Sequence, residues 1–125
     1  MEYERVKRFA IDVLGCGCDN SVFSRIDHDR NYRLPSGITL SSRILIGARL
    51  LIYVIDRDFA SPADFRSVVL DGLEERNSRG YNRLRVVLTT DNPESDLQKY
   101  SRIFNGIPSR DDKTHLHVIK RSESI

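Results

Sequence analysis

The sequence has 125 residues, of which 39% are hydrophobic and 30% are charged, with 20 basic against 18 acidic side chains. This length suits one domain that buries its own core, and the composition excludes a disordered chain and a scaffold that depends on disulfides. The net charge of +2 is too small to predict binding to nucleic acid or to an anionic membrane.

The first residues and the longest apolar stretch bear on the cellular location of the protein. Residues 1–5 are charged and lead into an amphipathic segment, so they do not read as a secretory signal. The apolar stretch 44–55 is interrupted by Gly47 and Arg49, and a bilayer requires about 20 apolar residues. We therefore expect a cytoplasmic protein with reduced thiols and no contact with a membrane.

Two helices are predicted in the first 26 residues. Apolar residues recur at helical spacing from Val6 to Leu14, and Gly15 is a natural stop because glycine readily adopts the left-handed conformation. The polar residues 19–21 are good N-caps. The apolar residues that follow them, up to Ile26, would give a short second helix one apolar face.

Two strands and a hairpin are predicted next. The polar segment 28–37 reads as an exposed connection. Segments 38–46 and 49–56 read as antiparallel strands joined at residues 47–48, where glycine in the first position favours a type II′ turn. Because residues 50–55 are all apolar, the second strand should be covered on both faces and lie centrally in the sheet.

The second half of the chain alternates helices with strands. Ser61 is a favourable N-cap and Pro62 a favourable first helical residue. The predicted elements are a helix from Pro62 to about Gly80, a strand over 83–90, a helix from Pro93 to Asn105, a strand over 114–120, and a polar tail, 121–125, that is free to fray.

These elements predict a single α/β domain over residues 1–125, in the order α-α-β-β-α-β-α-β. A strand–helix–strand–helix–strand series calls for parallel strands with right-handed crossovers. The sheet is therefore expected to be mixed and four-stranded, with helices packed on its faces. The free edge of the first strand, 38–46, offers a place where a second copy or another protein could pair.

Both cysteines, Cys16 and Cys18, lie in one short glycine-flanked segment. A thiol before a helix N-terminus can have a pKa well below 8.5, which favours a reactive or redox-active thiolate. Sulfurs at this spacing can also share a soft metal ion. Simple packing is the other interpretation, because free cysteine is among the most buried residue types.

The histidines His115 and His117 are predicted to project from the same face of the last strand. They could bind one metal ion alone, or complete a site with Cys16 and Cys18. The usual zinc spacings are C-x2–4-C and H-x3–5-H, and neither pair matches them. An exposed face of an edge strand explains both histidines without a metal.

Three aspartates follow predicted parallel strands at their carboxyl ends, where open α/β sheets bind ligands. If these strands are neighbours, Asp56, Asp58 and Asp91 could gather around a hard cation such as Mg²⁺. They are equally well explained as turn residues and solvated charges. No glycine-rich phosphate loop is present at either turn.

Four arginines surround Tyr81, at positions 76, 79, 83 and 85. Arginines with an interleaved aromatic can contact phosphates and bases. Two glutamates lie beside them, however, and cations are favourable at a helix C-terminus in any case. From the sequence we do not expect nucleic acid as a partner.

The favoured functional hypothesis is a small cytoplasmic domain with a reactive or redox thiol site at Cys16 and Cys18. The alternatives are a metal-binding domain that uses the cysteines with His115 and His117, and a protein-interaction module without catalysis. The sequence names no substrate and no cofactor, and it leaves open whether the chain is an enzyme.

Overall fold

A computed structural model describes residues 2–15, 25–108 and 110–125. Its core is a five-stranded sheet in the order β1-β2-β3-β4-β5. Strand β2 is antiparallel to both of its neighbours, β1 and β3, and β3, β4 and β5 are parallel. The elements are α1 (Glu2–Arg8), η1 (Phe9–Val13), β1 (Ile26–Arg33), β2 (Thr39–Ile46), β3 (Leu50–Asp56), η3 (Arg57–Phe59), α2 (Pro62–Arg79), β4 (Arg83–Thr90), α3 (Pro93–Asn105), β5 (Thr114–Lys120) and η4 (Arg121–Glu123).

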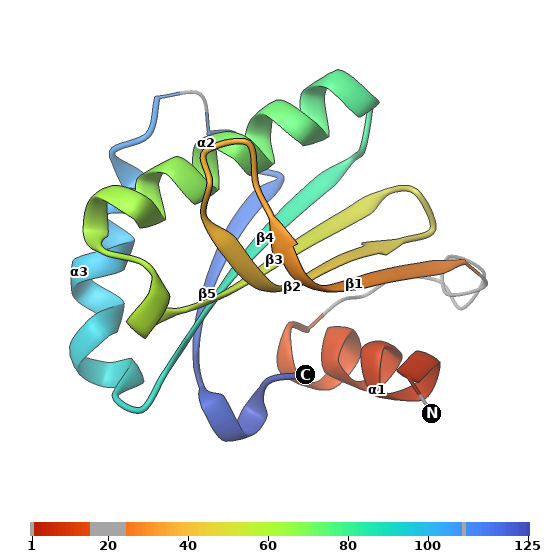
Figure 1. Cartoon of the computed structure of the whole chain (residues 1–125), viewed down its shortest axis with the longest axis horizontal. Coiled ribbons are helices and arrows are strands. Elements are labelled where there is room, and N and C mark those ends of the chain that lie inside the picture. Colours follow the sequence, from red (N-terminus) through yellow and green to blue (C-terminus); the bar gives the residue numbers. More distant parts are fainter. Residues whose placement is uncertain (1, 16–24, 109) are drawn as a thin grey trace.

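Helices cover both faces of the sheet (Figure 1). Helices α2 and α3, which make the two crossovers between parallel strands, pack on one face over the larger apolar cluster. Helix α1 and the π-helical turn η1 cover the other face, where Val6, Phe9 and Leu14 meet the second cluster. The chain's C-terminus lies beside α1. The predicted α/β class with a mixed sheet is confirmed.

The sheet has five strands, so the prediction of four is wrong. The additional strand is β1, which occupies most of the segment predicted as an exposed connection. Its sequence, Ile-Asp-His-Asp-Arg-Asn-Tyr-Arg, lacks the regular apolar alternation that marks a half-buried strand. Polar and charged side chains suit a strand that closes the edge of a sheet, and β1 pairs only with β2.

This additional strand changes two further expectations. Segment 38–46 corresponds to β2, which lies between β1 and β3 and has no free edge for a second copy. The edges are β1 and β5, and the charges along β1 oppose edge-to-edge pairing. Ile26, placed by the sequence in a second helix, is instead the first residue of β1. The rest of that predicted helix lies outside the described residues.

The remaining elements follow the predicted pattern closely. Strand β3 is central and its residues 50–55 are all buried. Helix α2 begins with a capping box, in which Ser61 and Asp64 each accept a hydrogen bond from the other's backbone N–H. Gly15 has φ +69°, which agrees with its predicted role after the first helix.

The β2–β3 hairpin has the predicted two central residues but a different turn. Gly47 and Ala48 both have positive φ, at 61° and 53°, and Arg49 N–H donates to the carbonyl of Ile46 at 3.1 Å. Positive φ at both positions defines a type I′ turn, whereas type II′ requires it only at the first. The right-handed twist of the flanking strands favours the I′ form despite the cost at Ala48.

Among the described residues, none of the helices combines the length and the apolar character needed to cross a membrane.

Candidate functional site

Cys16 and Cys18 lie outside the described residues, so the structure describes only the chain that leads to them. The carbonyl of Leu14 accepts a hydrogen bond from Arg85 Nη1 at 2.9 Å. Arg85 is half-buried on β4, and burial followed by repulsion from Arg83 lowers its pKa. A guanidinium is therefore fixed to the carbonyl two residues before Cys16 in the chain.

His115 and His117 share a face of β5, as predicted, and this face is the one that η1 covers. They stand in register with Arg85 and Val87 of β4. Arg85 Nη1 lies 2.8 Å from His117 Nε2. Because a guanidinium only donates, this Nε2 is the acceptor, and the ring is neutral with its proton on Nδ1.

The electrostatics of His117 agree with a neutral ring. Burial, then repulsion from Arg85 and from His115, lowers the pKa of His117 to about 4. Its Nε2 lone pair, which a metal would need, already accepts from Arg85. Within the described part of the chain, no group of three histidine, cysteine, aspartate or glutamate side chains could hold a metal ion.

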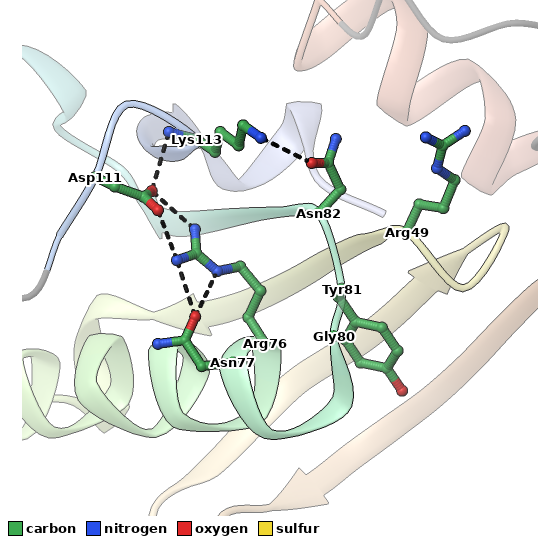
Figure 2. A pocket seen from close by; sticks show the side chains of 8 residues that line it. All are labelled: Arg49, Arg76, Asn77, Gly80, Tyr81, Asn82, Asp111 and Lys113. Atoms are coloured by element: carbon green, nitrogen blue, oxygen red, sulfur yellow. Dashed lines mark hydrogen bonds and ion pairs between the residues drawn. The ribbon is translucent and has the colours of Figure 1, made fainter.

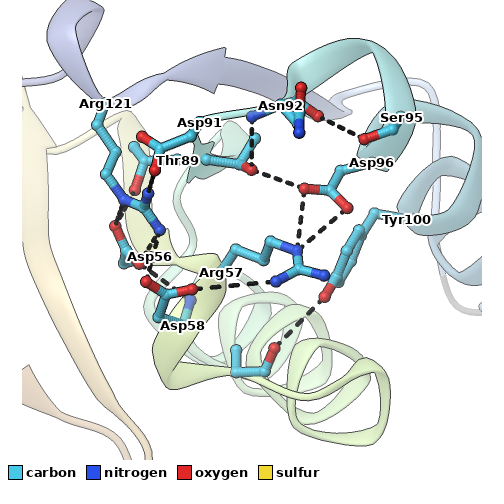
Figure 3. A network of polar contacts seen from close by, with 12 residues as sticks. Asp56, Arg57, Asp58, Thr89, Asp91, Asn92, Ser95, Asp96, Tyr100 and Arg121 are labelled. Atoms are coloured by element: carbon cyan, nitrogen blue, oxygen red, sulfur yellow. Dashed lines mark hydrogen bonds and ion pairs between the residues drawn. The ribbon is translucent and has the colours of Figure 1, made fainter.

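The three aspartates at the carboxyl ends of β3 and β4 do converge, because these strands are neighbours. They converge on a guanidinium (Figure 3). Arg121, in η4, lies 2.7 Å from Asp56, 2.9 Å from Asp58 and 2.5 Å from Asp91. The place suggested for a hard cation is thus held by the chain's own arginine, whose hydrogen bond lowers the pKa of Asp56.

A second polar cluster closes the same end of the sheet. Asp96, buried in the first turn of α3, accepts from Thr90 Oγ1 at 2.6 Å and from Arg57 Nε at 3.1 Å. These contacts connect α3 to the ends of β3 and β4 (Figure 3). Each carboxylate at this carboxyl-end edge therefore contacts an arginine of the chain itself, although the carboxylates outnumber the arginines.

The opposite edge of the sheet is hollowed. A pocket of about 460 Å³ opens where the β2–β3 turn, the end of α2 and the α3–β5 connection meet (Figure 2). The residues that line it are Arg49, Arg76, Asn77, Gly80, Tyr81, Asn82, Asp111 and Lys113.

Two of the lining residues form an ion pair between the buried Arg76 and the exposed Asp111. Arg76 donates from Nη1 and Nη2 to the two oxygens of Asp111, each at 2.8 Å, and Nη1 also bonds Thr114 at 3.1 Å. Donation from Arg76 lowers the pKa of Asp111, so this carboxylate is ionised and neutralised. The pair has a structural role, because it fixes the α3–β5 connection to α2.

The walls of the pocket carry cations and amide groups. Lys113 Nζ donates to Asn82 Oδ1 at 3.2 Å, and the Asn82 amide N–H₂ takes no part in that contact (Figure 2). Among the described residues, the exposed guanidinium of Arg49 has no carboxylate within ion-pairing distance and makes no side-chain hydrogen bond. With Asp111 neutralised by Arg76, the pocket has an excess of positive charge from Arg49 and Lys113.

The negative end of the α2 helix dipole reduces the positive charge of the pocket but does not cancel it. Its last turn points carbonyls toward the pocket, equivalent to about half a negative charge. One of those carbonyls, Arg76 O, already accepts hydrogen bonds from both Gly80 N–H and Tyr81 N–H. The two unpaired cations outweigh the helix end, so the pocket suits an anionic ligand.

A smaller hollow of about 260 Å³ lies between helix α1 and the C-terminus. Two arginines and two carboxylates line it, so the charges of these side chains balance: Arg5, Arg8, Asp12 and Glu123. Phe9, Val13 and Ile125 give it an apolar floor. The balanced charges of this hollow do not favour a ligand of either charge.

Sequence reasoning found only part of the pocket. Arg76 and Tyr81 belong to the predicted basic cluster, but Arg85 of that cluster lies on the opposite face of the sheet. Arg49 and Lys113 were not singled out, because nothing local distinguishes them. Their shared signal is positional, since each immediately precedes a strand that runs parallel to β4.

Comparisons of the chain with models of protein families, with curated proteins and with solved structures found no significant match. The functional conclusion therefore rests on the chemistry of the described residues.

Proposed function

We propose that this protein is a binding module for a phosphate-bearing ligand, with the pocket at the amino ends of the parallel strands as its site. The observation that carries the proposal is the pairing of Arg76 with Asp111. It neutralises the single carboxylate of the lining and leaves Arg49 and Lys113 to an external anion.

The chemistry of the lining favours phosphate over a simple halide or a carboxylate. Phosphate offers several acceptor oxygens in different directions, and the lining offers a planar guanidinium, an ammonium group and the amide of Asn82 as donors. These donors come from three separate connections, so their spacing is set by the sheet. A site without a nucleophile or a perturbed acid–base pair among these donors supports binding without catalysis.

Calorimetric titration with pyrophosphate tests this proposal. Replacing Arg49 or Lys113 by alanine is expected to weaken pyrophosphate binding about tenfold each, since a hydrogen bond to a charged group contributes about 1.5 kcal/mol or more. Arg66→Ala is the matched control, because it removes the same charge from the exposed face of α2 at its other end. Equal affinity in all three variants, or no binding by the wild type, would refute the site.

A second candidate function is the thiol chemistry predicted from Cys16 and Cys18. It is favoured by the bond from Arg85 to Leu14, two residues before Cys16 in the chain, because a cation that approaches a thiol stabilises its thiolate. In a reducing compartment such as the cytoplasm, both thiols would be reduced and available. In a variant of this proposal, the cysteines share a metal ion with His115 and His117. That variant requires His117 to give up its hydrogen bond with Arg85.

Alkylation by iodoacetamide at pH 6 measures the thiolate directly. If Arg85 activates a cysteine, the native protein should react at least about tenfold faster than the unfolded chain, whose thiols keep a pKa of about 8.5. Arg85→Met should abolish this excess and Arg85→Lys should retain part of it, with Cys16→Ser and Cys18→Ser identifying the sulfur. Slow alkylation that becomes normal only on unfolding would count against the proposal. Metal analysis of the same untagged protein, with and without Cys16→Ser, tests the metal variant.

A further inference from the structure

One edge of the sheet carries a basic residue at the end of nearly every strand. Arg25 precedes β1, Arg49 precedes β3, Arg83 begins β4 and Lys113 precedes β5. Backbone hydrogen bonds connect these residues, or residues close to them in the chain, across the sheet. Gly47 N–H donates to Arg25 O at 2.7 Å, Arg83 N–H to Arg49 O at 3.0 Å, and Leu84 N–H to Lys113 O at 3.1 Å. We call these four residues the basic row.

The basic row is exposed and its charge is largely uncompensated. All four side chains belong to exposed residues, and Arg79 at the end of α2 adds a fifth exposed cation beside them. In the described chain, three carboxylates lie at this edge. Asp27 is 3.8 Å from Arg25 in an exposed pair that contributes little, Asp111 is neutralised by Arg76, and Asp112 alone has no pairing cation.

The fold separates charges that the sequence mixes. Asp56, Asp58 and Asp91 lie at the carboxyl ends of the strands, together with Asp64 and Glu94 at the starts of α2 and α3. The net charge of +2 therefore conceals an acidic edge and a basic edge on the same sheet. The expectation against nucleic acid rested partly on that net charge, and the separation removes that part of its basis.

We infer that the basic row binds the phosphates of a single-stranded nucleic acid, with one phosphate seated in the pocket. This inference rests on the proposed function of the pocket and names its ligand. From β1 to β5 the row spans about 19 Å, four strand spacings, which the phosphates of one mononucleotide do not bridge. The four residues lie along one edge of the sheet, which suits one extended phosphate backbone, while Tyr81 of the pocket lining packs against the core.

Fluorescence anisotropy with a labelled 12-nucleotide single-stranded DNA tests the inference. Four phosphate contacts predict a log–log slope of affinity against salt concentration of about −3, because each contact on a single strand contributes about −0.7. Arg25→Ala and Arg83→Ala, which lie outside the pocket lining, should each flatten the slope by about 0.7. Neither change should alter pyrophosphate binding, and Arg66→Ala should alter neither measurement.

The outcomes separate this inference from the proposed function. Pyrophosphate binding together with DNA binding that ignores Arg25 and Arg83 would overturn the basic row and leave the pocket. DNA binding that depends on the row without any pyrophosphate binding would overturn the pocket alone. Equal affinity for a 12-base-pair duplex would overturn the single-strand assignment, and failure of both ligands to bind would overturn both proposals.

Discussion

Replacing Glu75 by alanine is expected to destabilise the fold by about 3 kcal/mol, because it leaves a buried guanidinium without its partner. Glu75 extends from α2 onto the sheet, where it accepts hydrogen bonds from Arg43 and from the Tyr53 hydroxyl. The Arg43 side chain is 12% exposed and Tyr53 is 1% exposed, so water replaces the lost carboxylate poorly. Asp29 compensates weakly, at 3.5 Å from Arg43 and half-exposed.

Urea denaturation of two further variants isolates this effect. Glu74→Ala removes a neighbouring exposed carboxylate from the same helix and should change the free energy of unfolding by no more than about 0.5 kcal/mol. Glu75→Gln keeps acceptor oxygen but not charge, and should fall between the wild type and Glu75→Ala. If Glu75→Ala and Glu74→Ala are equally stable, the bonds from Arg43 and Tyr53 do not hold α2 on the sheet.

The second large effect is a loss of stability in mild acid caused by His117. Its pKa is lowered to about 4 in the fold, first by burial and then by Arg85 and His115, whereas in the unfolded chain it is about 6.5. Between these values the unfolded chain binds a proton that the folded chain does not. Stability therefore falls as the pH drops from about 6.5 to about 4, by up to about 3 kcal/mol.

His117→Gln should remove this loss, since glutamine does not titrate and offers Arg85 an acceptor oxygen. The free energy of unfolding of the variant should change less than that of the wild type between pH 7 and pH 4, by up to about 3 kcal/mol. Carboxylates that titrate in this range do so in both proteins and cancel in the difference. Parallel pH profiles would contradict the assignment. Nitrogen-detected NMR of the imidazole would test the Nδ1–H form independently.

The sequence was sufficient to predict the elements that carry a clear apolar pattern or a clear helix cap. Strand β3 and helix α2 were predicted almost to the residue, because a fully apolar run and a capped helix leave few alternatives. Strand β1 was missed because its stability comes from hydrogen bonds to β2, which impose no pattern on its own side chains. A polar edge strand becomes visible only once its neighbour is placed.

The candidate site was less predictable than the fold for a related reason. The sequence brought Asp56, Asp58 and Asp91 together correctly, through the rule for parallel strand ends, but could not foresee that Arg121 returns from the last strand to pair with all three. Arg49 and Lys113 are ordinary surface residues until β3, β4 and β5 are aligned. Local chemistry can be read from neighbours in the chain, whereas the position of a charge relative to other charges requires the sheet order.

The separation of acidic and basic edges gives the molecule an electric dipole moment along its strands. Such a moment rotates the protein in the field of a polyanion before contact, so that more encounters begin with the basic edge foremost. The rate of association, and not only the affinity, should therefore fall as salt screens the field over about 10 Å at 0.1 M. A protein with almost no net charge can thus be steered electrostatically, because orientation depends on where its charges lie.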